Sequence, residues 1–195
     1  MTQSAPRAAQ LDDFWAIPEG ERFHEFLSGE IVRRADPSAE HGSAQVGVVR
    51  AVAPPFQRRS GGGGPGGWWI LTEVEVLLET GNLVRPDIVG SRRERSPERP
   101  TGTPIKLRPD FVCEIVSESS AHVDTVKKLR LYHQAGLPYY WLVDPRDSTL
   151  TVMRHSADGY VTLLRAERHE VVRAEPFDAI EIPVGTLFGD DPPEV

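Results

Sequence analysis

The sequence predicts one domain of the α/β class, in which short strands and two longer helices share a single core. With 195 residues and 39% hydrophobic content, the chain is long enough to bury one core and needs no second domain. Apolar residues alternate in several strand-like runs and follow a helical period in two segments, and no segment repeats. We expect the domain to span residues 12–188, with flexible termini at 1–11 and 189–195.

An amino-terminal hairpin and a helix are expected first. Two strand-like arms within Arg22–Arg34 turn at Ser28 and Gly29. Ser38–Val52 then carries apolar residues at helical spacing, and we expect the helix to be closed by the prolines that follow at positions 54 and 55. Both elements therefore present one apolar face to a common core.

A glycine-rich loop separates this helix from the central strands. The run Gly61–Gly67 contains nothing that can pack, which predicts a flexible loop. Trp68–Leu78 and Leu83–Val89 follow as two strands, antiparallel because the link between them is short. The β-branched and apolar run Phe111–Val116 predicts a further central strand.

The carboxy-terminal half predicts one more helix and the rest of the sheet. Ser119–Ala135 has an apolar side and ends before a glycine, which is typical of a helix. A strand over Tyr139–Val143 and a hairpin formed by Leu150–Arg154 and Tyr160–Arg165 complete the sheet. The tail Phe177–Phe188 is expected to add an edge strand.

Composition limits the class of protein. No window approaches the roughly 18 apolar residues of a membrane span and the amino terminus lacks an apolar targeting segment, so we expect a cytoplasmic protein with no membrane partner. Cys113 is the single cysteine and cannot form an internal disulfide or a thiolate cluster. Its place in a strand predicts a small buried side chain.

Two acidic residues stand out inside apolar strands. Asp87 lies in Leu83–Val89 and Glu114 lies in Phe111–Val116, where a carboxylate is rarely buried without compensation. Alternation along the strand turns Glu114 away from Cys113. Two such carboxylates on neighbouring strands indicate a shared cation, and Mg²⁺ is usually held by one or two carboxylates.

The net charge of −7 argues against a protein covered in phosphate-binding residues, but one face can still be basic. Arg58, Arg59 and the loop Ser91–Pro100 are candidates for such a face. The alternative is a solvated loop, because Glu94 and Glu98 are interleaved with its arginines. Composition alone leaves both interpretations open.

Four phrases together resemble a known family. They are FHEFLSGEI (Phe23–Ile31), VRPDIV (Val84–Val89), PDFVCEIVSESS (Pro109–Ser120) and KLRLYHQAGLPYYWLVDP (Lys128–Pro145). In this order they resemble the Uma-type family of putative restriction endonucleases of bacteria, within the PD-(D/E)XK nuclease superfamily. The resemblance implies a restriction-endonuclease-like core, a central mixed sheet flanked by helices, with Asp87 and Glu114 as metal carboxylates.

The chain departs from the superfamily pattern at the lysine. The pattern has a lysine two residues after the second acid, where this chain has Val116. The Uma-type pattern implies that a lysine of the following helix replaces it, and Lys128 matches that placement. Lys127 is the rival, turned about 100° away on a helix. The alternative for both is a solvated helix charge.

Two further residues match the family phrases. Glu25 shares a strand face with Phe23 and Leu27, and it either completes the acidic cluster or faces water if the hairpin turns its other side inward. His41 stands at a helix start, where it could hold a water or a phosphate, although a histidine in that position is more often unspecialised. Glu25 and His41 are therefore expected only as additions to Asp87, Glu114 and Lys128.

These residues together predict an endonuclease that hydrolyses phosphodiester bonds of nucleic acid, most simply DNA, with Mg²⁺ or Mn²⁺ as cofactor. The catalytic residues would be Asp87, Glu114 and Lys128, with the first two as metal ligands. A homodimer is expected because cleavage of both strands favours paired active sites. The alternative is a catalytically silent scaffold that keeps the fold and some of the acids.

Overall fold

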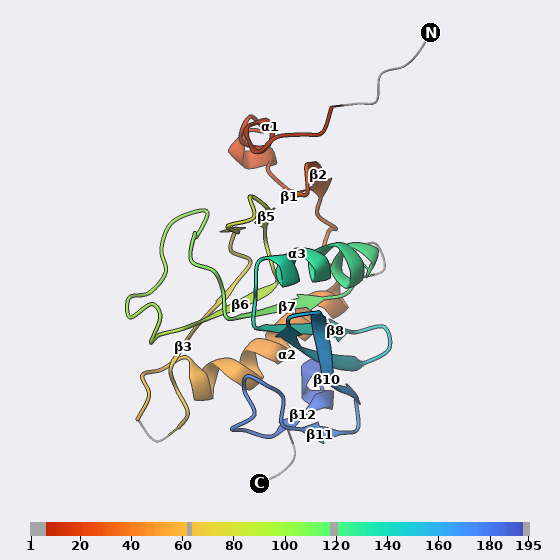
Figure 1. Cartoon of the computed structure of the whole chain (residues 1–195). Helices are drawn as coiled ribbons and strands as arrows, with labels where there is room; N and C mark the ends of the chain where they lie inside the picture. Colours follow the sequence, from red (N-terminus) through yellow and green to blue (C-terminus); the bar gives the residue numbers. More distant parts are fainter. Residues whose placement is uncertain (1–6, 62–63, 118–120, 193–195) are drawn as a thin grey trace.

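The computed structural model describes residues 7–61, 64–117 and 121–192, and a six-stranded sheet runs through their centre (Figure 1). Its strand order is β10-β9-β8-β7-β6-β3. Strands β7 and β8 pair in parallel and the remaining neighbours pair antiparallel, so the predicted mixed sheet is confirmed. The strands are β3 (Trp68–Thr72), β6 (Ile88–Arg92), β7 (Phe111–Ile115), β8 (Tyr139–Asp144), β9 (Thr149–Ser156) and β10 (Gly159–Glu167).

A smaller sheet lies above the large one in the view of Figure 1. Its order is β2-β1-β5-β4, and it includes the predicted amino-terminal hairpin with its turn at Ser28 and Gly29. Its strands are β1 (His24–Leu27), β2 (Glu30–Arg33), β4 (Val76–Leu77) and β5 (Leu83–Val84). Helix α1 (Leu11–Trp15) buries Phe14 against this sheet, and the short helix η1 (Glu19–Glu21) follows it.

Helix α2 (Ala39–Phe56) covers one face of the large sheet. Ser38 caps its start by accepting a hydrogen bond from the His41 N–H at 3.2 Å. The helix does not close at Pro54, as the sequence suggested, but continues to Phe56. That last turn is stabilised by burial of the Phe56 ring, whose centroid lies 4.7 Å from that of Phe177.

The opposite face is covered by the second predicted helix, which is not a regular α-helix. Within it, η2 (Val123–Lys128) is a π-helix and α3 (Leu129–Gln134) continues as an α-helix. The expected first residues of this helix, at positions 119 and 120, lie outside the described residues. Tyr132 and Tyr140 pack edge to face beneath α3 and are fully buried.

The two long central strands of the prediction are each broken in the middle. Glu73 has a positive φ of 55° and separates β3 from β4, and Arg85–Asp87 separates β5 from β6. Pro86 cannot donate a ladder hydrogen bond, which ends β5 at this point. The antiparallel pairing was correct, but each strand leaves the large sheet for the small one at its break. Asp87 therefore lies at a junction between sheets and not within a strand.

The tail does not form an edge strand of the large sheet. Strands β11 (Val171–Val172) and β12 (Ile182–Pro183) form a separate two-stranded sheet, and the short helix η3 (Val184–Phe188) follows them. The tail closes the core beneath α2, where Leu187 is fully buried. A separate pair suits this packing because Pro183 offers no N–H to a longer ladder.

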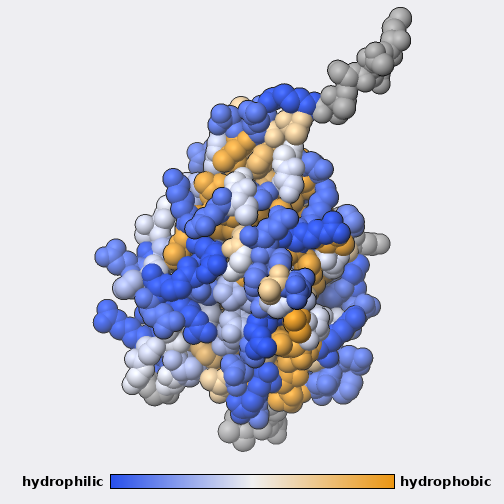
Figure 2. Space-filling model, viewed as in Figure 1, coloured by the Kyte–Doolittle hydropathy of each residue, from blue (hydrophilic) through white to orange (hydrophobic). Residues whose placement is uncertain are grey.

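Three further expectations concern the single cysteine, membrane-spanning helices and the ends of the chain. Cys113 is fully buried on the α2 side of the sheet, as expected for a small apolar side chain. Among the described residues, no helix is both long and apolar enough for a membrane crossing. Most of the face seen in Figure 2 is hydrophilic. Residues 1–6, 62–63 and 193–195 lie outside the described residues, and the domain bounds 12–188 stay a prediction.

Candidate active site at the junction of the two sheets

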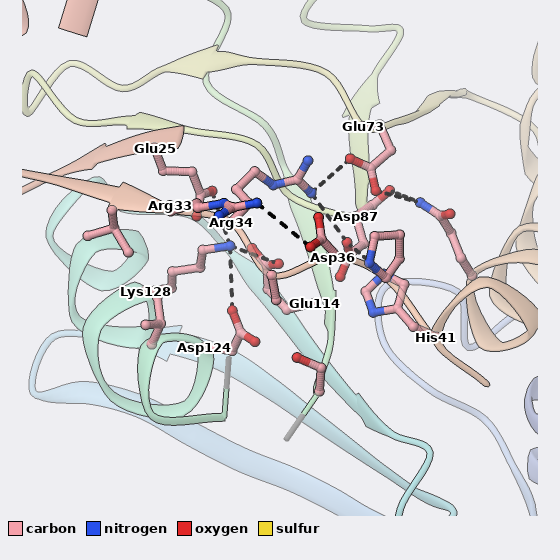
Figure 3. A pocket seen from close by; sticks show the side chains of 16 residues that line it. Glu25, Arg33, Arg34, Asp36, His41, Glu73, Asp87, Glu114, Asp124 and Lys128 are labelled. Atoms are coloured by element: carbon pink, nitrogen blue, oxygen red, sulfur yellow. Dashed lines mark hydrogen bonds and ion pairs between the residues drawn. The ribbon is translucent and has the colours of Figure 1, made fainter. Parts of the chain in front are cut away.

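A pocket of about 550 Å³ opens where the two sheets meet, and charged side chains line most of it (Figure 3). They come from β1, the segment after β2, the start of α2, both strand breaks, β7 and the π-helix. The charged residues that carry the following argument are Glu25, Arg34, His41, Glu73, Asp87, Glu114, Asp124 and Lys128. The structure thus brings together five of the six residues expected from the sequence, and the sixth, Lys127, points elsewhere.

One half of the pocket is built around the ammonium group of Lys128, and we call it the Lys128 cluster. Its Nζ lies 3.1 Å from Glu25 Oε1, 3.1 Å from Glu114 Oε2 and 3.5 Å from Asp124 Oδ1. All four side chains are at most 5% exposed. Of the two placements considered for Glu25, the structure has the buried one. Buried charges of this kind persist only when they are paired.

Backbone and phenol groups hold the carboxylates of the Lys128 cluster in place. The Tyr132 hydroxyl donates a short hydrogen bond to Glu114 Oε1, and the Arg85 N–H donates to Glu25 Oε1 at 2.7 Å. Burial raises the pKa of Glu114 well above its ordinary value, against the opposing effect of Lys128. Burial would lower the pKa of Lys128, but the surrounding carboxylates, Glu114 foremost, raise it well above its ordinary value. Lys128 is therefore an ammonium at neutral pH.

Asp124 and Lys128 stand four residues apart on η2 and face the same pocket. Residues at this spacing share one face of a helix. Lys127 points outward instead, and its Nζ lies 2.6 Å from Glu30 Oε2 at the surface. The two lysines thus occupy different environments, as the angular separation along a helix requires.

The other half of the pocket surrounds Asp87, and we call it the Asp87 cluster. Asp87 Oδ1 lies 3.2 Å from His41 Nε2, and Oδ2 accepts a hydrogen bond from the Ile115 N–H at 2.6 Å. Arg34 lies 2.8 Å from Glu73 Oε2 and 3.8 Å from Asp87 Oδ1. This cluster is more open, because the side chain of Glu73 is 40% exposed.

Asp87 and His41 shift each other's protonation in opposite directions. The hydrogen bond to Asp87 raises the pKa of His41, although burial acts against this. Burial alone would raise the pKa of Asp87, but the hydrogen bond and charge of His41 outweigh it and lower that pKa. Each of the two groups therefore favours the charged form of the other.

The donor groups of the Asp87 cluster suit a metal ion. One ligand atom from each of His41, Glu73 and Asp87 lies within 4.8 Å of the other two. Two carboxylates and an imidazole are donors that Mn²⁺ accepts, and carboxylates suit Mg²⁺. His41 Nδ1 is buried without a hydrogen-bond partner among the described residues. Glu114 uses one lone pair on each oxygen for Tyr132 and Lys128, which leaves a second on each.

Several pocket residues were not expected from the sequence. Glu73 and Arg34 join the site through the break after β3 and the segment after β2. The sequence carried no signal for the positive φ of Glu73, which turns the chain at that point. Asp124 did carry a signal, because it stands four residues before Lys128.

The mixed sheet flanked by helices, with acids and a lysine in one pocket, defines a protein of the restriction-endonuclease-like class. The chain matches the Uma2 family, described as "Putative restriction endonuclease", over residues 11–185, and it belongs to that family. The expected family is thus confirmed.

Among solved structures that match the chain is a "putative nuclease belonging to DUF820" from Anabaena variabilis, which shares the fold. It is 24% identical, superposes with a TM-score of 0.68, and the match covers 92% of this chain and 97% of the other. At that identity the likeness shows the fold alone. No curated protein matches the chain.

Proposed function

We propose that the protein is a divalent-metal-dependent endonuclease that hydrolyses phosphodiester bonds in DNA. The observation that carries the proposal is the meeting of the two clusters in one pocket: potential metal donors around Asp87, and a buried ammonium at Lys128. Membership of a family described as putative restriction endonucleases supports the same class of reaction. Mg²⁺ or Mn²⁺ is the proposed cofactor.

The proposed ligands are Asp87 and Glu114, with Glu73 and His41 completing the set. Asp87 is the member common to the sequence expectation and to the donor group of the structure. A bound divalent ion would supply a nucleophilic water at neutral pH and offset negative charge on the phosphate. His41 then serves as a neutral imidazole ligand, which means that it releases the proton it holds beside Asp87.

Lys128 is proposed to stabilise charge and not to act as a base. Its pKa is raised by the carboxylates around it, so it carries no free lone pair near neutral pH. Its three N–H donors face Glu25, Glu114 and Asp124, so its proposed role is to offset by its charge the negative charge that grows on a phosphate in the pocket. In the overall reaction the oxygen of water bonds to phosphorus, the bond to the leaving oxygen breaks, and that oxygen takes a proton.

The proposal is tested by cleavage of supercoiled plasmid and single-stranded DNA with Mg²⁺, Mn²⁺ and EDTA. The unaltered chain should cut in the presence of metal and not in EDTA. Asp87→Ala is the negative control, because a contaminating nuclease would remain in its preparation. Equal cutting by both proteins would reject the assignment. A homodimer, which we also propose, predicts twice the chain mass in sedimentation.

A silent scaffold is the second candidate, and one observation favours it. Glu114 and Glu25 are already paired with Lys128, and Arg34 lies 3.8 Å from Asp87, so internal cations neutralise part of the acidic pocket. A scaffold predicts no metal binding by calorimetry. A nuclease predicts metal binding that depends on Asp87.

A further inference from the structure

We infer that a second hollow, between the glycine-rich loop and the end of β6, binds phosphate groups of the nucleic-acid backbone away from the cleaved bond. This inference rests on the proposed function and adds a binding site to it. The hollow has a volume of about 360 Å³. Its lining includes three arginines, one acid and loop glycines: Arg59, Arg92, Arg93, Glu94, Gly66 and Gly67.

Two of these arginines are held in place by aromatic rings. The Arg92 guanidinium lies 4.6 Å from the Trp68 ring centroid, and that of Arg93 lies 3.6 Å from the Trp69 ring centroid. Arg93 Nε also donates to the Trp68 carbonyl oxygen at 2.9 Å. Stacking fixes the planar group while leaving N–H donors free at its edge. Such a fork matches the geometry of phosphate oxygens.

Within the described part of the chain, none of the three arginines of the hollow forms an ion pair with a carboxylate. Arg95, three residues after Arg92, shows the contrast, because it pairs with Asp110. The whole chain has 29 acidic and 22 basic residues, so acidic partners are plentiful. Arginines that lack carboxylate partners in an acidic protein favour the binding of an external anion. The sequence left open whether this region was a basic face or a solvated loop, and the hollow favours the former.

The hollow and the active-site pocket lie at opposite ends of the same strand pair. In the ladder of β3 and β6, Trp68 pairs with Arg92 at one end and Thr72 with Ile88 at the other, next to Asp87. Arg92 follows Asp87 by five positions along the chain, or about 17 Å at 3.4 Å per residue of extended strand. One strand of B-form DNA carries a phosphate every ~3.4 Å along its axis, so this spacing equals about five nucleotides. A bound strand lying along β3, the edge of the sheet, would reach both sites.

The test is binding of fluorescent duplex DNA in EDTA, so that no cleavage is involved, over a range of salt concentrations. The Arg92→Gln/Arg93→Gln double variant should weaken binding at least tenfold at low salt. It should also reduce the slope of log K against log salt by about 2, since each phosphate contact contributes about 0.9. Arg165→Gln is the matched control, because Arg165 is exposed on β10 at the other edge of the sheet.

Arg59→Gln gives an independent measurement, because Arg59 is exposed and its replacement cannot disturb a core. It should lower the salt slope by about 1. If the unaltered protein binds DNA and all these variants keep its affinity and slope, the second hollow is not a phosphate site, while the proposed nuclease stands. If the unaltered protein does not bind DNA at any salt concentration, both inferences fail.

Discussion

The two halves of the pocket compensate negative charge differently. In the Lys128 cluster, three buried carboxylates converge on one buried ammonium, and the Tyr132 phenol and the Arg85 N–H donate to two of them, Glu114 and Glu25. In the Asp87 cluster, Asp87 is buried but Glu73 is partly exposed, and the two acids share His41 and Arg34. The first half keeps its cation within the protein, whereas the second can accept a metal ion once His41 releases its proton. One pocket thus combines a fixed charge, the Lys128 ammonium, with a place for an exchangeable one, the metal ion. Both charges can act on the same phosphate.

The largest expected effect comes from removing the fixed charge. Lys128→Ala leaves three buried carboxylates without their cation, which should cost about 3–5 kcal/mol of unfolding free energy at pH 8. Because the remaining carboxyls are then driven to bind protons, the loss should shrink as the pH falls toward 5. Denaturant unfolding measures both. DNA cleavage should be abolished while metal affinity changes little.

Lys127→Ala is the matched control for Lys128→Ala. Its ion pair with Glu30 lies at the surface, so the loss should be at most about 1 kcal/mol with cleavage retained. If Lys127→Ala proved inactive and Lys128→Ala active, the assigned roles would be reversed. Normal cleavage by both variants would remove lysine from the mechanism.

Binding of the metal ion, the exchangeable charge, should depend on the Asp87 cluster. Asp87→Asn keeps an oxygen for the Ile115 N–H but removes the charge, and it should weaken Mn²⁺ binding about 100-fold, or about 2.7 kcal/mol. Glu114→Gln should weaken it less, about tenfold, because that carboxylate is already engaged by Lys128. Isothermal calorimetry checks the order. A larger effect from Glu114→Gln would place the metal in the other half.

A hydrogen bond to a buried charged group should matter more than one to a neutral group. Tyr132→Phe removes the donor to Glu114 and should cost about 1.5–3 kcal/mol, measured by chemical unfolding. Tyr140→Phe is the control, because its hydroxyl donates at 2.8 Å to the neutral carbonyl of Asp124 and should cost about 1 kcal/mol. Equal losses would mean that Glu114 is protonated in the folded protein.

The smallest expected effect is a pH dependence confined to the Asp87 cluster. The pKa of His41 is raised in the folded chain, so its stabilising contribution is fully present below the unfolded value near 6.5. It is lost as the pH rises through the raised value. In EDTA, unfolding free energy should therefore fall over this window more steeply for the unaltered chain than for His41→Gln. Parallel pH profiles would show that the histidine does not interact with Asp87.

The sequence was most informative where a local pattern matched its final environment. The family phrase placed Lys128 on the helix that lines the pocket, and the apolar runs around Asp87 and Glu114 predicted that these acids are buried. The breaks at Glu73 and Arg85–Asp87 could not be predicted, because alternation looks the same whether a strand continues in one sheet or enters another. The π-helix was equally hidden, since the apolar residues of this segment also fit an ordinary α-helix.

Every passage of the chain between the two sheets delivers a side chain to the pocket. The segment after β2 brings Arg34, the break after β3 brings Glu73, and the break before β6 brings Asp87. The pocket is therefore lined by the segments that connect the two sheets. A ligand that contacts residues of both sheets binds only the arrangement in which the two sheets meet, and it therefore stabilises the folded chain. The free energy of unfolding would then rise with the ligand concentration, although the ligand contacts only the residues of the pocket.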